Sequence, residues 1–264
     1  MVNKLKKIQI ATYNIRTDTE EDGNWAWDYR KDKVLELINY HSWDIFGAQE
    51  LMPNQVESLS QLNDYSSFTE EREGDQLGEG LGIYYKTEMF TCLDKGYFWL
   101  SDTPDKASIH PEAGCKRIAL WVVLTEIETQ TTFLLINTHL DHISDVARLE
   151  GMKVLLDLLA DKIANYPTVL LGDFNAEPEE IIHDLLKKQF RYAREEHDVL
   201  VYGPKGSFQG FDYQLPWSEL EDIDYILYKD LTCIKQGVLT DSCDGKYPSD
   251  HFPIVATFNF EKEN

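Results

Sequence analysis

Short apolar runs that end in polar residues recur along this chain, and this pattern constrains its fold more than any other feature. The clearest case is the run 168–171, which predicts a buried strand and is followed directly by Gly172-Asp173-Phe174-Asn175. An acid and an amide two residues apart at a strand end can point into one cleft, where they hold a hard cation or orient a water molecule. Taken alone, the tetrapeptide fits a polar turn that caps the strand equally well.

The same arrangement recurs elsewhere in the chain. Any one such residue is more simply explained as a cap or a turn. Their repetition at strand ends indicates instead a site on the rim of a sheet, because solubilising charges would be scattered over helix faces. The residues are Asn14 after 8–13, Glu50 after 45–49, His139 after 133–138, Asp224 inside 223–227, and Asp250-His251 before the last run.

The order of the expected elements favours an α+β fold. Strands outnumber helices, short turns join several neighbours, and strict alternation of strand and helix is absent. This pattern favours mixed or antiparallel sheets covered by helices over a doubly wound parallel sheet. We expect strands at 6–13, 44–48, 80–86, 90–100, 118–127, 132–138, 168–171, 223–228, 231–239 and 253–260, and helices at 29–40, 53–62 and 144–165.

The composition limits the class of protein. The chain of 264 residues has no repeat or Pro/Ser-rich linker, so residues 1–264 are expected to form a single domain. Its 47 Asp and Glu outnumber its 25 Lys and Arg, for a net charge of −22, which disfavours binding to a long nucleic acid. The four cysteines form no CxxC pair, so neither a disulfide framework nor a structural zinc site is expected. The N-terminus is too polar for a signal peptide and no run approaches about 20 apolar residues, which predicts a soluble cytoplasmic protein.

The polar residues at the strand ends fit phosphoester hydrolysis with a divalent metal. Glu50 and Asn14, together with an aspartate, offer the hard oxygen ligands that suit Mg²⁺ or Mn²⁺. A water held by Asp173 and Asn175 can then attack phosphorus. No pair of histidines has the helical spacing of a zinc site.

The histidines have a separate role in this interpretation. His139 and His251 can stabilise charge on the phosphoryl oxygens. Asp224, placed in an apolar strand, can orient His251 and raise its basicity. His142 is expected to support the site from behind His139.

Six motifs in order along the chain resemble the exonuclease-endonuclease-phosphatase superfamily. Its members include deoxyribonuclease I, apurinic endonucleases, inositol polyphosphate 5-phosphatases, neutral sphingomyelinases and deadenylases. Each motif is common by itself, but six in order, from Asn14 to His251, are specific. They are Tyr13-Asn14-Ile15-Arg16, Gln49-Glu50, Asn137-Thr138-His139-Leu140-Asp141-His142, Gly172-Asp173-Phe174-Asn175, Ile223-Asp224-Tyr225-Ile226 and Ser249-Asp250-His251.

The resemblance implies a fold and a set of roles. The fold is a four-layer sandwich of two packed mixed β-sheets flanked by helices, with the site at one rim. The resemblance also implies a Mg²⁺ or Mn²⁺ cofactor. The implied roles are Asn14 and Glu50 at the metal with Asp250 nearby, Asp173 and Asn175 positioning the attacking water, His139 at the scissile phosphate, and Asp224 supporting His251.

Within the superfamily, the chain looks most like a bacterial branch allied to deadenylase- and nocturnin-like enzymes. Trp27 with Arg30, the segment 98–105 and the segment 208–211 carry this likeness. The chain departs from apurinic endonucleases, which have an aspartate where it has Arg16 and a tyrosine where it has the segment 137–139. These departures disfavour repair of abasic sites.

Arg117 has two interpretations of equal weight. It follows a loop and opens a strand, so its guanidinium can clamp a phosphate through two hydrogen bonds. It can equally be a strand-start arginine in an ion pair, since acids are abundant in this chain.

The sequence therefore predicts a divalent-metal-dependent phosphoester hydrolase, a phosphodiesterase or a phosphatase, that acts on a phosphorylated small molecule or a short oligonucleotide. An exonuclease acting from the 3′ end, or an endonuclease, of RNA or DNA is the alternative enzyme. A catalytically inactive binding module on the same fold is the alternative of another class. A two-carboxylate glycosidase leaves the histidines and amides without roles.

Overall fold

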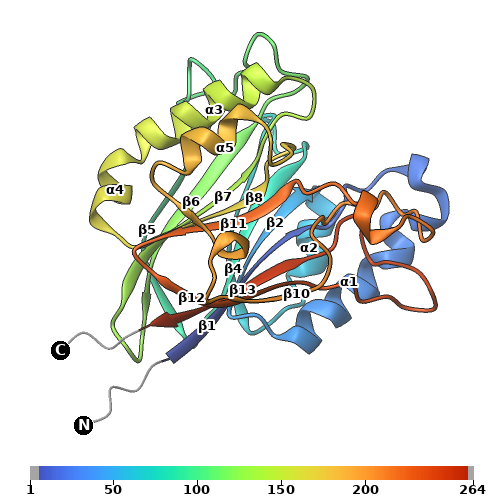
Figure 1. Cartoon of the computed structure of the whole chain (residues 1–264). Helices are drawn as coiled ribbons and strands as arrows, with labels where there is room; N and C mark the ends of the chain where they lie inside the picture. Colours follow the sequence, from blue (N-terminus) through green and yellow to red (C-terminus); the bar gives the residue numbers. More distant parts are fainter. Residues whose placement is uncertain (1–5, 261–264) are drawn as a thin grey trace.

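The computed structural model describes residues 6–260 and contains two β-sheets (Figure 1). The seven-stranded sheet has the order β10 (Leu200–Tyr202), β12 (Thr232–Val238), β13 (Ile254–Phe260), β1 (Lys6–Asn14), β2 (Ile45–Leu51), β4 (Gly80–Lys86) and β3 (Tyr65–Glu71). The six-stranded sheet has the order β5 (Phe90–Trp99), β6 (Ile118–Glu126), β7 (Thr132–His139), β8 (Thr168–Asp173), β11 (Asp224–Lys229) and β9 (Arg191–Tyr192). Both sheets are mixed, because β1 and β2, β10 and β12, and β7 and β8 pair in parallel.

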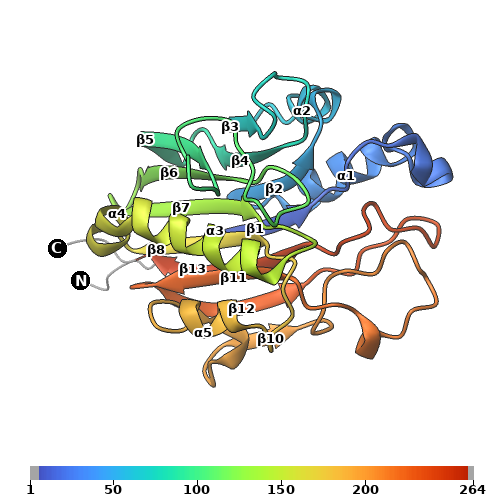
Figure 2. The same cartoon turned by 90° about the horizontal axis from the view of Figure 1, so that it is seen from above.

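Helices cover the outer faces of both sheets, which gives the four layers predicted from the resemblance (Figure 1). The helices α1 (Trp27–His41) and α2 (Pro53–Leu59) pack on the seven-stranded sheet. The helices α3 (Asp145–Leu158), α4 (Ala160–Asn165) and α5 (Ile181–Leu186) pack on the six-stranded sheet. Seen from above, α3 lies over the strands of the six-stranded sheet (Figure 2). Short 3₁₀ turns lie at η1 (Glu20–Trp25), η2 (Ala193–Glu195) and η3 (Trp217–Glu219). The predicted fold class is confirmed.

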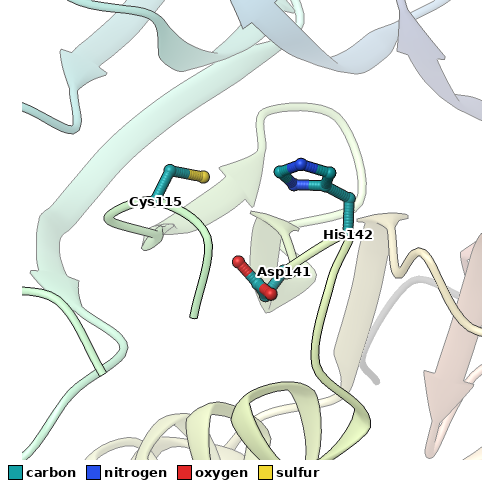
Figure 3. A group of neighbouring side chains, drawn as sticks. All are labelled: Cys115, Asp141 and His142. Atoms are coloured by element: carbon teal, nitrogen blue, oxygen red, sulfur yellow. The ribbon is translucent and has the colours of Figure 1, made fainter. Parts of the chain in front are cut away.

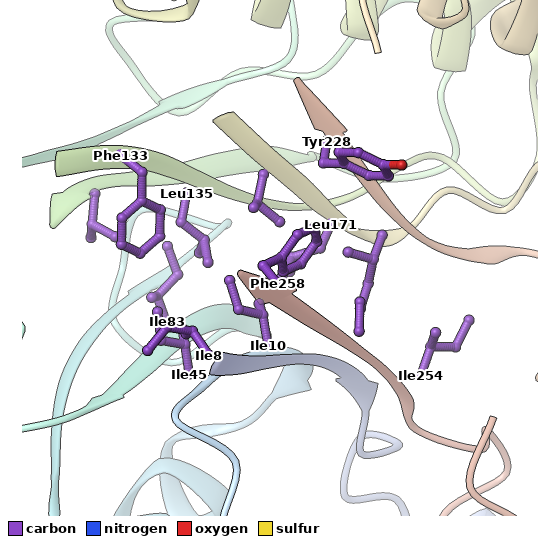
Figure 4. Packing of buried hydrophobic residues seen from close by; sticks show 14 of the residues in the cluster. Ile8, Ile10, Ile45, Ile83, Phe133, Leu135, Leu171, Tyr228, Ile254 and Phe258 are labelled. Atoms are coloured by element: carbon purple, nitrogen blue, oxygen red, sulfur yellow. The ribbon is translucent and has the colours of Figure 1, made fainter. Parts of the chain in front are cut away.

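The largest apolar cluster lies between the two sheets (Figure 4). Alternate residues of each strand point into it, as the period of two in a strand requires. Ile8 and Ile10 enter from β1, while Phe133 and Leu135 enter from β7, and all four are fully buried. This shared core fixes the two sheets against each other, so the strand ends that carry the polar motifs lie close together.

Several elements differ from the sequence-based expectation. The helix expected over 144–165 is broken at Leu159, where φ is −100° and ψ is 8°. Leu159 and Ile163 stay on the same buried side across the break, so the apolar periodicity continues through it. The sequence analysis also missed the strands β3, β9 and β10 and the helix α5. Strand β3 lies at a sheet edge and buries only Phe68, which leaves it without an alternating apolar pattern.

Two further expectations can be compared with the structure. All four cysteines are free thiols, in agreement with the absence of a disulfide framework. In the described part of the chain, no helix combines the length and apolar character needed to span a bilayer.

Candidate active site

The parallel pairing of β7 and β8 places His139 beside Asp173 in register. Gly172 allows this pairing, because its φ of 144° favours glycine and a Cβ there would lie 1.9 Å from the carbonyl oxygen of Thr138. His139 Nε2 lies 3.5 Å from Asp173 Oδ2. The glycine of the Gly-Asp-Phe-Asn motif therefore has a structural task, which is to bring the aspartate to the histidine.

On its other side, Asp173 is paired with Asp224 across the antiparallel strands β8 and β11. Asp224 Oδ2 lies 2.7 Å from His251 Nδ1 and accepts a hydrogen bond of 2.6 Å from the Ser207 hydroxyl. The ring of Phe208 packs 4.8 Å from the His251 ring. The Asp224–His251 pair predicted from the motifs is thus formed, and His251 Nε2 lies 3.8 Å from Asp173 Oδ2.

The seven-stranded sheet contributes Asn14 and Glu50 from the ends of β1 and β2. Glu50 sits in an irregularity of the β2–β4 pairing between Ala48 and Leu51 and has a φ of 64°. Asn14 Nδ2 donates to both Glu50 Oε1 and Asp173 Oδ2, each at 2.9 Å. Asn14 therefore bridges a carboxylate of one sheet to a carboxylate of the other, and its amide oxygen accepts from the Arg16 N–H.

Backbone strain is concentrated at this site. Besides Glu50, Arg16 has a φ of 60° and Asn175 a φ of 48°. Left-handed backbone at residues other than glycine costs free energy and persists where surrounding contacts hold it. The Glu50 conformation is held by the N–H of Thr17, which donates to Glu50 Oε2 at 2.7 Å. The Asn175 conformation is held by its own N–H, which donates to Asp173 Oδ1 at 2.9 Å.

The donor set at the centre fits a hard divalent cation. One ligand atom each from Glu50, Asp173 and His251 lies within 4.8 Å of the other two, and oxygen ligands dominate, as Mg²⁺ and Mn²⁺ prefer. Asp250 lies beside this group, 3.7 Å from the Arg16 guanidinium. Burial raises the pKa of Asp250, and the Glu50 carboxylate adds to the rise. Crowded buried carboxylates are the arrangement that a cation between them would stabilise.

The protonation states in the centre are set by burial and by neighbouring charges. Burial and then the charge of Asp224 raise the pKa of Asp173 to about 7. Burial alone would lower the pKa of His251, but the charge and hydrogen bond of Asp224, with Asp250 and Asp173, raise it to about 10. Burial would raise the pKa of Glu50, yet the Asn14 hydrogen bond and the positive His251 keep it below its usual value. His251 is therefore a cation at neutral pH.

His139 is the uncharged counterpart of His251. Burial and the positive charge of Arg117 keep its pKa well below its usual value. Asn175 Nδ2 lies 3.0 Å from His139 Nε2 and donates to the Leu140 carbonyl at 3.0 Å. The neutral His139 can thus accept from Asn175 through Nε2 while its other ring nitrogen carries the proton.

Glu79 belongs to the site and was missed by the sequence analysis. Its Oε1 lies 3.8 Å from His139 Nδ1, 3.8 Å from Arg117 Nη1 and 2.6 Å from Arg72 Nη1. Burial and the charge of Glu50 raise the pKa of Glu79 to about 7. Glu79 lies between Gly78 and Gly80, just before β4 begins. No apolar run precedes it, so the signal that identified the other site residues is absent.

Arg117 lies at the edge of the site, and two of its three guanidinium nitrogen atoms make no hydrogen bond in the described part of the chain. The side chain is 7% exposed, and its Nε and Nη1 find no hydrogen-bond partner within residues 6–260. Nη2 lies 3.2 Å from His142 Nδ1. Unpaired N–H groups of a buried guanidinium are costly unless a ligand accepts from them. The contact with Glu79 is too long for a hydrogen bond, so it does not satisfy Nη1.

Arg30 is the second residue whose importance the sequence did not reveal. It is buried, and its guanidinium donates to the carbonyl oxygens of Trp25, Ile15, Arg16 and Pro248. These contacts join the loop after β1 to the loop that carries Asp250 and His251. The sequence analysis noted Arg30 only together with Trp27, as part of the likeness to deadenylase- and nocturnin-like enzymes, and nothing in the sequence indicates a partner 218 residues away.

The fold and the site together define an α/β sandwich with an acid–histidine cluster at the adjoining ends of both sheets. The Endonuclease/Exonuclease/phosphatase family model matches residues 11–251, and the chain belongs to this family. The predicted resemblance is therefore confirmed. The family comprises phosphoesterases that generally depend on a divalent metal.

Two solved structures are similar over nearly the whole chain. A functionally unknown conserved protein from Enterococcus faecalis V583 is 52% identical, with a TM-score of 0.92 over 94% of this chain and 98% of that one. A mannosyl-6-phosphatase from Bacteroides thetaiotaomicron VPI-5482 is 31% identical, with a TM-score of 0.86 over 96% of this chain and 100% of that one.

The sequence is also similar to exoribonuclease subunits of fungi. The CCR4-Not complex 3′-5′-exoribonuclease subunit Ccr4 of Candida glabrata is 24% identical, and 91% of this chain aligns with 34% of that protein. The chain thus spans only about a third of the length of these curated fungal relatives.

Proposed function

We propose that this protein is a Mg²⁺- or Mn²⁺-dependent phosphoester hydrolase that acts on a small phosphorylated substrate, with a sugar phosphate as the substrate class. The observation that carries the proposal is the convergence of Glu50, Asp173 and His251, whose ligand atoms lie within 4.8 Å of one another. The similarity to a mannosyl-6-phosphatase over 96% of the chain supports a sugar phosphate.

Within this centre, the metal would be held by the carboxylates of Glu50 and Asp250 and by the amide oxygen of Asn14. Asp173 and the protonated His251, which lie next to Glu50, would act on the water and on the phosphate instead of ligating the metal. As the structure stands, Asn14 turns its amide nitrogen toward Glu50 and Asp173, so the ligand role requires the amide to be reversed. When bound, the cation supplies positive charge at the phosphate and lowers the pKa of a coordinated water.

Asp173 and Asn175 orient the attacking water in this proposal. With a pKa near 7, Asp173 accepts a proton from water more readily at neutral pH than an ordinary aspartate does. Asn175 is fixed by the Leu140 carbonyl and by its own N–H bond to Asp173. The water is thereby placed for attack along one direction, which removes much of the entropic cost of the reaction.

The remaining side chains stabilise the charge that develops on the phosphoryl oxygens. His251, held protonated by Asp224, donates through Nε2. His139 donates through the ring nitrogen that carries its proton. Arg117 binds the phosphate of the substrate by donating through Nε and Nη1, which have no hydrogen-bond partner among the described residues. Preorganised donors of this kind, aimed at developing charge, are usually the largest contribution to catalysis.

The charge of the chain favours small substrates over long nucleic acids. A net charge of −22 repels a polyanion unless cations gather near the site. Lys116, which precedes Arg117 in the chain, is already paired with Glu73. The similarity to 3′-5′-exoribonuclease subunits keeps a nuclease as the alternative.

A panel of substrates tests the proposal. Release of inorganic phosphate from sugar phosphates and other phosphomonoesters, and release of the alcohol from phosphodiesters, are measured with Mg²⁺, with Mn²⁺ and with EDTA. We expect turnover of sugar phosphates that needs the metal and changes little with salt. Shortening of oligonucleotides with a steep loss of activity at higher salt would favour the nuclease. If no substrate of the panel were turned over, or if turnover did not need the metal, both the phosphoesterase and the nuclease would be contradicted. The inactive binding module would then be the remaining hypothesis.

A further inference from the structure

A second group of metal-ligating side chains lies beyond Arg117, outside the centre described above. Cys115 comes from the loop before β6, while Asp141 and His142 follow β7 (Figure 3). The Cys115 sulfur, one Asp141 oxygen and one His142 ring nitrogen lie within 4.8 Å of one another. Asp141 is buried, Cys115 is half-buried and His142 is exposed, so the group is open to solvent on one side.

The position of Asp141 is fixed by the backbone. Its Oδ1 accepts from the N–H groups of Ile143 and Ser144, and its Oδ2 accepts from the N–H of Gly114, each at 2.9 Å. Oδ2 therefore keeps a lone pair for another partner. Hydrogen bonds that hold a ligand in place are typical of metal sites, where they orient the ligating atoms.

Close packing between the two loops brings the thiol to the imidazole. A Cβ at Gly114 would lie 2.7 Å from Ile143 Cγ1 and 3.2 Å from His142 Cε1. Only glycine allows this approach without moving the neighbours, and Cys115 is the next residue. A cavity of about 10 Å³ adjoins the group and is lined by Cys115, Asp141 and His110. This volume is that of about one water molecule, which is the size of a further ligand to a metal ion.

We propose that Cys115, Asp141 and His142 form a second metal site, selective for Zn²⁺ or Co²⁺ over Mg²⁺. Thiolate and imidazole ligands suit these borderline ions, whereas Mg²⁺ takes oxygen ligands almost exclusively. On binding, the metal replaces the thiol proton, which passes to solvent. The divalent cation, the Asp141 carboxylate and the Cys115 thiolate together carry no net charge. The complex can therefore form next to the positively charged Arg117.

Metal binding at this site competes with the contact between His142 and Arg117. A neutral imidazole has one unprotonated nitrogen, and here Nδ1 accepts from Arg117 Nη2 at 3.2 Å. A metal on Nδ1 displaces Arg117 directly. A metal on Nε2 requires the proton to move to Nδ1, which then faces the guanidinium. In either case, Arg117 loses its acceptor. If Arg117 binds the substrate phosphate, as the proposed function states, occupancy of the second site changes KM.

The site is tested with cobalt as a spectroscopic probe. The reduced protein is saturated with Mg²⁺ and titrated with Co²⁺, and the sulfur-to-cobalt charge-transfer band is followed in the near ultraviolet. Oxygen ligands at the catalytic centre give no such band, so the signal reports only a thiolate. We expect the band in the wild-type protein and in Cys243→Ser, a matched control for a half-buried thiol, and its loss in Cys115→Ser. His142→Asn should weaken Co²⁺ binding by at least about tenfold.

Two results would overturn the second site, namely no band in the wild-type protein or an undiminished band in Cys115→Ser. The effect on the substrate is measured separately, as KM for a phosphomonoester with and without Zn²⁺ at saturating Mg²⁺. We expect Zn²⁺ to shift KM in the wild-type protein but not in Cys115→Ser. A cobalt band without any shift in KM would overturn the coupling through Arg117 and leave the metal site supported, so the two failures are distinguishable.

Discussion

Asp224 and His251 are joined by a contact of 2.7 Å between Oδ2 and Nδ1, and both side chains are almost fully buried. The second oxygen of Asp224 has no hydrogen-bond partner in the described part of the chain. The pair therefore depends on its own contact and on the Ser207 hydroxyl. It fixes the imidazole in one orientation, with Nε2 facing Asp173 at 3.8 Å.

Removing either member should disable the pair as a unit. We expect Asp224→Ala and His251→Ala each to lower kcat/KM by about 2–4 kcal/mol, the scale for loss of one preorganised donor. The double variant should cost little more than the worse single variant, because the two groups act together. The measurement is kcat/KM for the four proteins of the cycle. Costs that simply add would show that the two residues act independently.

The same pair should make stability depend on pH. His251 binds its proton more tightly when folded, since its pKa rises from 6.5 to about 10. Its stabilisation is therefore complete below about pH 6.5 and is lost as the pH rises through about 10. Between pH 7 and 10, the wild-type protein should lose at least about 1 kcal/mol more stability than His251→Asn, because one pKa unit corresponds to about 1.4 kcal/mol.

Urea unfolding in EDTA at pH 7 and pH 10 measures this difference. The raised pKa of Asp173, about 7, changes stability mainly below this window. Lysines, tyrosines and cysteines titrate alike in both proteins, so the comparison isolates the pair. Parallel losses in the wild-type and variant proteins would mean that His251 is not held protonated by Asp224.

Glu50 should control the affinity for the catalytic metal. We expect Glu50→Gln to raise the Mg²⁺ concentration that gives half-maximal activity by about tenfold or more, the scale for perturbing a metal site. Glu57→Gln on α2 is the matched control, because Glu57 is exposed and has the same charge. A Glu50→Gln protein with wild-type turnover at limiting Mg²⁺ would exclude Glu50 as a ligand.

The parts of the fold and site that the sequence revealed share one physical signal. Buried strands such as β8 and β11 are apolar because both of their faces are covered, and the polar residues at their ends, Asp173 and Asp224, therefore stand out. The family motifs added the assignment of His251 to Asp224. The structure brings these residues together with Asn14, Glu50, His139, Asn175 and Asp250, and the catalytic and metal-binding roles that the motifs imply stay predictions.

The parts that the sequence did not reveal depend on long-range contacts. Glu79 has no apolar strand before it, and Arg30 resembles any helical arginine until its carbonyl partners are known. Strand β3 is stabilised by pairing with β4 and not by its own pattern. The break at Leu159 carries no glycine or proline. Such features are set by tertiary packing, which overrides local propensity.

Asp173 and Asn175 should affect turnover more than substrate binding. We expect Asp173→Asn and Asn175→Ala each to lower kcat by about 100-fold or more with little change in KM, because contacts that form fully only in the transition state raise kcat. Asparagine at 173 keeps an acceptor for the Asn14 amide, so the fold should persist. The measurement is steady-state kinetics with circular dichroism as a check on folding. An unchanged kcat in Asp173→Asn would exclude its role in orienting water.

Arg30 should prove essential for stability although it is remote in sequence from every motif at the C-terminal end. Arg30→Met removes the guanidinium donor from four carbonyl oxygens, of which those of Ile15 and Pro248 are buried while that of Arg16 keeps the Gln55 amide as a donor, and each buried acceptor left unpaired costs about 1–3 kcal/mol before relaxation. We therefore expect a loss of about 3–5 kcal/mol in the free energy of unfolding, measured in urea against Lys33→Met on the same helix.

Because the Pro248 carbonyl is one of the four, the loop carrying Asp250 and His251 should also loosen and kcat/KM should fall. Arg30→Lys keeps the charge but not the planar fork, so it should restore only part of the stability. Equal stability of Arg30→Met and Lys33→Met would mean that these loops are held by other contacts.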